Sequence, residues 1–160
     1  MSAIGRCVRM KTSDLDRCLA IAAQVTPAPP SRWPWQKPAE SLADVFAREW
    51  AGAVLDDDVF AGSGYLLSSY FLAQNELNGV PDPFDSPEGL TLAKVFTAAF
   101  PVRAPQALPP LDPTTLAAFC DDEWGDDGPG MFQGIQQADG FLRAGMSRRR
   151  EGEAVVFLIA

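Results

Sequence analysis

The hydrophobic pattern predicts a strand at each end of the chain. Residues 4–10 carry apolar side chains at positions 4, 8 and 10, with Arg6 and Arg9 between them, as in a short half-buried strand. Residues 153–159 form a continuous β-branched and aromatic run, which is typical of a strand buried on both faces. We therefore expect these two strands to pair at the centre of a small sheet.

Between the two strands, apolar residues recur with the helical period of about 3.6 residues. Ser13 is expected to cap the first helix, and Ser41 with Asp44 forms a capping-box pattern before the second, which fades at the acidic residues 56–58. Further helices are predicted over residues 65–77, 87–100, 113–119 and 131–149, and Asn78-Gly79 is expected to end the first of these. Loops are predicted over the proline-rich residues 26–38 and 101–113 and over residues 125–130.

These elements predict an α+β fold that is mostly helical. The chain of 160 residues has the length of a single domain, which we expect to span residues 1–160. Its small sheet contains the N- and C-terminal strands and is covered by five or six helices.

The composition removes several kinds of chemistry. The chain contains no histidine, so neither a Ser-His-Asp nor a Cys-His arrangement can form, and histidine-based zinc sites are excluded. Cys7, Cys18 and Cys120 lack C-x-x-C spacing, and the glycine motifs of nucleotide-binding loops are absent. We therefore expect no catalytic residues, no cofactor and no metal site, and a protein that is not an enzyme.

The expected location is the cytoplasm. The longest apolar run, residues 154–160, is too short to cross a membrane, and charges interrupt the first residues where a signal peptide would be apolar. Three cysteines without a pairing pattern are typical of reduced thiols.

Charge is distributed unevenly along the chain. The net charge is −8, yet residues 1–40 carry six basic and three acidic side chains, and residues 141–160 carry four basic and two acidic. The middle, residues 41–140, has sixteen acidic and three basic side chains. Such an acidic region disfavours nucleic acid and anionic membranes as partners, and it attracts basic proteins.

The candidate partner-binding residues are two acidic groups and three tryptophans. They are Asp56, Asp57, Asp58, Asp121, Asp122, Glu123, Asp126, Asp127, Trp33, Trp35 and Trp124. Acidic groups steer a basic partner, and tryptophan is a frequent interface anchor. The alternatives are that the acidic runs are solvated surface and that the indoles of Trp33 and Trp35 cap the core.

Three segments carry a family resemblance. They are the start Met-Ser-Ala-Ile-Gly-Arg-Cys-Val-Arg-Met followed by residues 13–19, a helix opened by Leu90-Thr91 with a second near Leu116, and the close from Phe141-Leu142-Arg143 through residues 149–153 into residues 154–159. In these segments the chain resembles the YfbM-like bacterial proteins of unknown function. The resemblance implies an α+β fold and supplies no catalytic residues.

Together these features favour a bacterial toxin-immunity or inhibitor type of protein, which neutralises a basic partner, such as a cognate toxin or effector domain, by occlusion. Two alternatives stay open. One is an enzyme that uses a metal held by carboxylates, and the other is a housekeeping or oligomeric structural domain.

Overall fold

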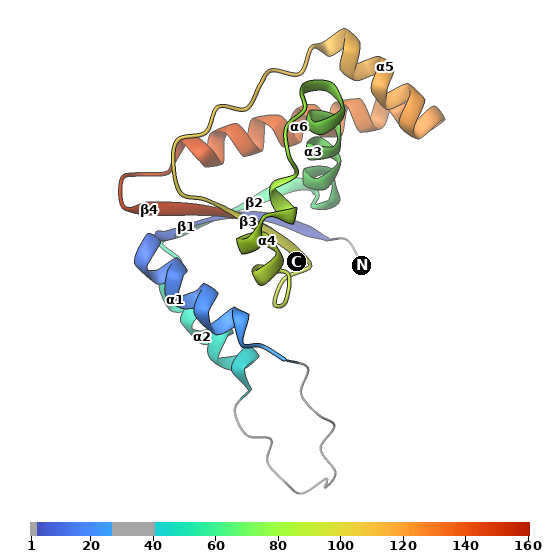
Figure 1. Ribbon diagram of the computed structural model, residues 1–160. Helices are drawn as coiled ribbons and strands as arrows, with labels where there is room; N and C mark the ends of the chain where they lie inside the picture. The colour runs from blue at the N-terminus through green and yellow to red at the C-terminus, as the bar shows by residue number, and fades with distance from the viewer. Residues whose placement is uncertain (1–2, 27–40) are drawn as a thin grey trace, which may run out of the picture.

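A four-stranded antiparallel sheet lies at the centre of the protein (Figure 1). The structure, a computed structural model, describes residues 3–26 and 41–160. The strand order is β2-β1-β4-β3, with β1 at Ile4–Lys11, β2 at Asp56–Ser63, β3 at Ala98–Val102 and β4 at Glu153–Ile159. The terminal strands β1 and β4 are the two central strands, in register from Gly5 opposite Ile159 to Lys11 opposite Glu153. The predicted pairing is therefore confirmed.

Helices cover both faces of the sheet, which confirms the α+β class. Figure 1 shows α1 (Thr12–Ala23) and α2 (Leu42–Ala53) on one side, and α3 (Tyr65–Asn78), α5 (Pro113–Trp124) and α6 (Gly128–Ser147) on the other. The short α4 (Pro87–Leu92) packs with α1 and with β3.

Strand β4 joins two hydrophobic cores. Val155, Phe157 and Ile159 belong to the core below α3 and α6, whereas Val156 and Leu158 belong to the core over α1 and α2. Each of these side chains is at most 2% exposed, as the continuous apolar run predicts for a strand covered on both faces.

The ends of the predicted helices agree with the structure in two places. Ser41 accepts a hydrogen bond from the Asp44 backbone N–H, and Asp44 accepts one from the Ser41 N–H, so the capping box is present. Helix α3 ends at Gly79, whose φ of 67° is the left-handed conformation that glycine favours. The proposed Ser13 cap is wrong, because α1 begins directly after β1, at Thr12.

The helix predicted over residues 87–100 is wrong in its second half. Only Pro87–Leu92 is helical, and Ala98–Val102 forms β3 along the outer edge of β4. Without β3, the backbone groups on that edge of a buried strand would lack partners. Pro101 is tolerated because β3 is itself an edge strand, where a missing N–H costs little.

The acidic residues 56–58 do not follow the second helix directly. Helix α2 ends at Ala53, and these residues begin β2, an edge strand that the sequence analysis did not predict. Most of β2 is solvent-exposed, so its polar residues hide the alternation that marks a strand.

The loop predicted over residues 125–130 is also wrong. Helix α5 continues to Trp124, a short 3₁₀ turn η2 (Gly125–Asp127) follows, and α6 begins at Gly128. Gly128 lies so close to α5 that an added Cβ would be 2.5 Å from Asp121 Oδ1, so glycine allows the two helices to approach here.

Candidate functional site

Negative charge is concentrated in the helical layer that contains α3, α5 and α6. Residues 65–85 and 104–147, which build this layer and its connections, carry ten carboxylates and one cation, Arg143. Arg143 is already paired with Asp139, at 3.0 Å. This layer therefore carries a net charge of −9, and the remainder of the chain carries +1, which together give the net charge of −8.

The first predicted acidic group, Asp56–Asp58, is neutralised by arginines from other elements. Asp57 pairs with Arg6 at 2.8 Å and Asp56 with Arg9 at 2.8 Å. Arg148, just after α6, lies 3.5 Å from Asp56 and 4.0 Å from Asp58. These carboxylates cross-link β1, β2 and the end of α6, so they do not form a free acidic surface.

Glu153 completes this ion-pair cluster on the central strands. It accepts two hydrogen bonds from Arg9 Nη1, at 2.7 and 2.8 Å. The Arg9 guanidinium lowers the pKa of the Glu153 carboxyl below its usual value. The cluster thus fixes β2, β1 and β4 to one another at one end of the sheet.

The second predicted acidic group lies at the junction of α5 and α6. We call it the acidic corner; it comprises Asp121, Asp122, Glu123, Asp126 and Asp127, all of which are exposed. Within residues 3–26 and 41–160, no ion pair joins any of them to a cation. Unlike Asp56–Asp58, this group presents uncompensated charge to solvent.

The two acidic groups do not share one surface. The acidic corner precedes the first residue of α6, and Asp56–Asp58 contact Arg148, which follows its last residue (Figure 1). A helix of 20 residues is about 30 Å long at 1.5 Å per residue. One small contact therefore cannot include both groups.

Trp124 lies within the acidic corner and is half-buried. Its ring meets Phe119 edge-on at a centroid distance of 5.7 Å, and both side chains pack against the core. Trp124 thus places a partly exposed aromatic surface beside the carboxylates. Trp33 and Trp35 lie outside the described residues.

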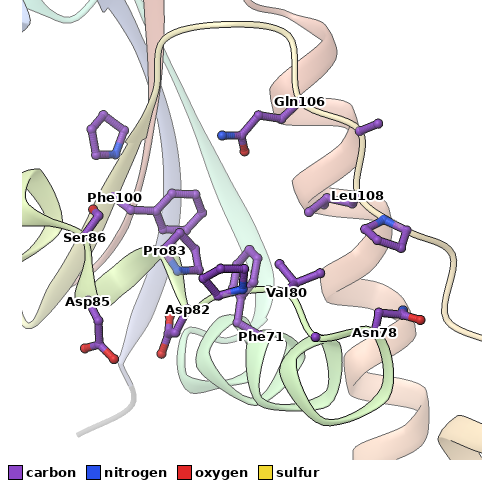
Figure 2. Close-up of a pocket in the computed structure, with 15 residues that line it drawn as sticks. Phe71, Asn78, Val80, Asp82, Pro83, Asp85, Ser86, Phe100, Gln106 and Leu108 are labelled. Carbon is purple, nitrogen blue, oxygen red and sulfur yellow. The ribbon is translucent and has the colours of Figure 1, made fainter.

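The structure adds a cavity that the sequence analysis missed. It has a volume of about 830 Å³ and lies between the end of α3, the 3₁₀ turn η1 (Pro83–Asp85), β3 and residues 106–109 (Figure 2). The sequence signal that marks it is the density of proline in its two connecting segments, which predicted loops but not a space between them.

The three cysteine thiols and the side chain of Tyr70 are buried. Cys7, Cys18 and Cys120 are free thiols with no exposed surface, and desolvation raises the pKa of Cys7 to about 11. Desolvation also raises the pKa of Tyr70, to about 12. In the part of the chain that the structure describes, no group of three or more Cys, Asp or Glu side chains could hold a metal ion.

Comparisons with protein-family models, curated proteins and solved structures find no significant match to this chain. The YfbM-like resemblance therefore stays a prediction. Across residues 3–26 and 41–160, every helix is too short or too polar to cross a bilayer. The fold and the charge distribution define the class as an α+β protein with a strongly acidic helical layer.

Proposed function

We propose that this protein binds a basic partner protein through the acidic corner and neutralises it by occlusion, without catalysis, as a toxin-immunity protein or inhibitor does. The observation that carries the proposal is the cluster of five exposed carboxylates that no described cation compensates. Clustered charge of one sign accelerates the encounter with an oppositely charged protein and orients it.

Helix stability does not account for the corner. Asp121, Asp122 and Glu123 lie in the last turn of α5, where the helix dipole is negative and no basic residue accompanies them. Each acid at this end costs about 0.3–1 kcal/mol, and the acids also repel one another. Asp126 and Asp127 precede α6, where the dipole favours acids, so only part of the corner has a structural benefit.

The contact also has an apolar component. Trp124 and Phe119 lie beside the carboxylates, and a half-buried tryptophan can exclude water from the centre of an interface. The proposed contact thus combines long-range steering by charge with a short-range aromatic anchor. A cytoplasmic setting fits the three free, buried thiols, which a reducing compartment preserves.

The test compares two variants with the same change of charge. The corner variant is Asp122→Asn, Glu123→Gln and Asp126→Asn, which leaves Asp121 beside Gly128 and Asp127 at the start of α6. The control is Asp16→Asn, Glu76→Gln and Glu151→Gln, three exposed acids away from the acidic corner, and Arg103, the partner of Asp16, keeps its pairing with Glu88.

Affinity capture from the source cells, with the wild type and both variants as bait, identifies the partner by mass spectrometry. We expect a basic protein that the wild type and the control retain and the corner variant loses. Association with the purified partner should slow by at least about tenfold between 0.05 and 0.5 M NaCl. The proposal fails if no basic protein separates the variants, or if salt leaves the association rate unchanged.

A further inference from the structure

The cavity of Figure 2 has an apolar floor. Phe71 and Phe100 lie beneath it, are 2% and 1% exposed, and meet each other edge-on at 5.3 Å, so the apolar surface open to a ligand belongs mainly to Val80, Pro81, Pro83 and Pro109. Its volume of about 830 Å³ falls within the range of small-molecule sites, about 300–1,000 Å³. The apolar surface and this volume together suit a small organic ligand with an apolar body.

The lining of the cavity carries two carboxylates, and its amide and hydroxyl side chains, Asn78, Ser86 and Gln106, can each both donate and accept. Asp82 and Asp85 are its only charged residues, and no lysine or arginine of the described chain lines it. Four further lining residues are prolines, which have a carbonyl but no N–H: Pro81, Pro83, Pro101 and Pro109. A ligand that donates hydrogen bonds and carries positive charge complements such a lining.

Asp82 is exposed at the rim of the cavity, and none of the ion pairs within residues 3–26 and 41–160 includes it. Its Oδ1 accepts a hydrogen bond from the Phe84 backbone N–H at 3.0 Å, and it caps the 3₁₀ turn η1. Desolvation raises the pKa of Asp82, and the neighbouring charge of Asp85 raises it further. A bound cation would favour the charged form of the Asp82 carboxyl and so counteract both the desolvation and the repulsion from Asp85.

One wall of the cavity is held by side chains and not by secondary structure. Arg143 donates to the carbonyls of Leu108 and Pro109, at 2.9 and 3.1 Å, and the buried Gln74 also donates to Pro109 O, at 2.7 Å. Residues 104–107, all of which are exposed, make no backbone–backbone hydrogen bond to any residue that the structure describes. Gln106 extends from this segment across the cavity toward Phe100 (Figure 2). This wall can therefore adjust around a ligand while Leu108 and Pro109 stay fixed.

We propose that this cavity binds a small organic cation, an amine or guanidinium group attached to an aromatic or aliphatic body. The cationic group lies against the exposed carboxylates of Asp82 and Asp85, and the apolar body packs on Val80 and on the prolines that line the cavity above Phe71 and Phe100. The proposal is independent of the acidic corner, which lies at the far end of α5 from the segment that forms the cavity wall.

The probes are 4-phenylbutylamine, its neutral isostere 4-phenylbutanol and its acidic isostere 4-phenylbutyrate, titrated into the ¹⁵N-labelled protein and followed by NMR. We expect the amine to bind about tenfold more tightly than the alcohol, since one charge-assisted contact is worth roughly this factor, and the acid to bind least. Shifts should concentrate at residues 78–86 and 106–109. A blocked lysine peptide is the further arm: if it binds more tightly than the free amine, the site takes a protein side chain and the small-molecule proposal is overturned.

The matched variants are Asp82→Asn with Asp85→Asn, which keeps the cap acceptor, and Asp122→Asn with Asp126→Asn, which removes the same charge at the acidic corner. The first should reduce the preference for amine over alcohol to within about twofold, and the second should leave it intact. If the double variant does not fold, the single variant Asp85→Asn, at an exposed position, provides a second measurement of the preference for amine over alcohol. Equal binding of amine and alcohol to the wild type, or shifts away from the cavity, overturns the proposal. If the variant Asp82→Asn with Asp85→Asn loses amine binding but still captures the basic partner protein, the cavity and the acidic corner are separate sites.

Discussion

Gly145 sets the distance between α6 and the central sheet. A Cβ added at this position would lie 2.7 Å from Phe157 Cζ and 2.8 Å from Cys7 Sγ, closer than real Cβ contacts. Phe157 and Cys7 are fully buried and belong to the paired strands β4 and β1, so neither can move aside freely. Gly145→Ala must therefore displace α6 or distort the sheet.

Gly140 provides a matched control on the same helix. An added Cβ there would meet nothing within 4 Å, and the residue is exposed. Replacing glycine by alanine in a helix gains about 0.5–1 kcal/mol of stability, and this gain applies at both positions. At Gly145 overpacking costs about 1–3 kcal/mol, which exceeds this gain by up to about 2.5 kcal/mol, so the net change is destabilising.

Urea unfolding, followed by circular dichroism and by tryptophan fluorescence, measures both variants. We expect Gly140→Ala to unfold at a higher urea concentration than the wild type and Gly145→Ala at a lower one, with unchanged m values. If Gly145→Ala were as stable as Gly140→Ala, the close packing of α6 on β1 and β4 would be wrong.

Three further predictions concern Tyr70, the arginines of the ion-pair cluster and the cysteines. Between about pH 10 and 12, the free energy of unfolding should fall by up to roughly 2–3 kcal/mol more in the wild type than in Tyr70→Phe. The reason is that the raised pKa of Tyr70, about 12, keeps its hydroxyl protonated in the folded protein, whereas the hydroxyl ionises near pH 10 in the unfolded chain. Equal pH slopes of the two proteins in urea titrations would refute this. Arg9→Met should lower the urea midpoint more than Arg6→Met, because Arg9 bridges Asp56 and Glu153 at 16% side-chain exposure whereas Arg6 is 42% exposed; equal shifts would contradict the role of the ion-pair cluster. A thiol reagent should modify no cysteine of the native protein at neutral pH and all three after denaturation, and fast native labelling would show that a thiol is accessible.

The parts of the fold that the sequence predicts correctly rest on local signals. The terminal strands have strong strand patterns, Ser41 and Asp44 form a capping box within four residues, and Gly79 ends α3 at the position where glycine is favoured. Each of these signals lies within the element that it determines. They were sufficient for the fold class and for the central strand pair.

The missed strand β3 shows how a distant partner can determine the local structure. Residues 98–102 form a strand because β4 has an open edge, although β4 lies more than fifty residues further along the chain. The different packing of Gly140 and Gly145 depends on Cys7 and Phe157, which are remote in sequence. Local propensity contains no information about either partner.

The same distinction applies to the candidate site. The sequence located both acidic groups, but it could not show that Arg6, Arg9 and Arg148 neutralise Asp56–Asp58, because those ion pairs join residues 47 to 92 positions apart. The cavity depends on how residues 106–109 lie against η1 and β3, and no local pattern specifies that arrangement. Only the acidic corner, whose residues are contiguous in sequence, could be predicted together with its charge.

The acidic corner therefore makes a prediction about stability as well as binding. If Asp122 and Glu123 serve a partner and not the fold, then Asp122→Asn with Glu123→Gln removes repulsion at the negative end of α5 and should stabilise the protein by about 0.5–1 kcal/mol at low salt. The gain should shrink toward zero near 0.5 M NaCl, because both residues are exposed and screening already weakens their repulsion. Urea unfolding of the wild type and the variant, at low salt and at 0.5 M NaCl, measures the gain in stability under each condition. A loss of stability in this variant would mean that the fold itself depends on the carboxylates, and the argument that they are present for a partner would then fail.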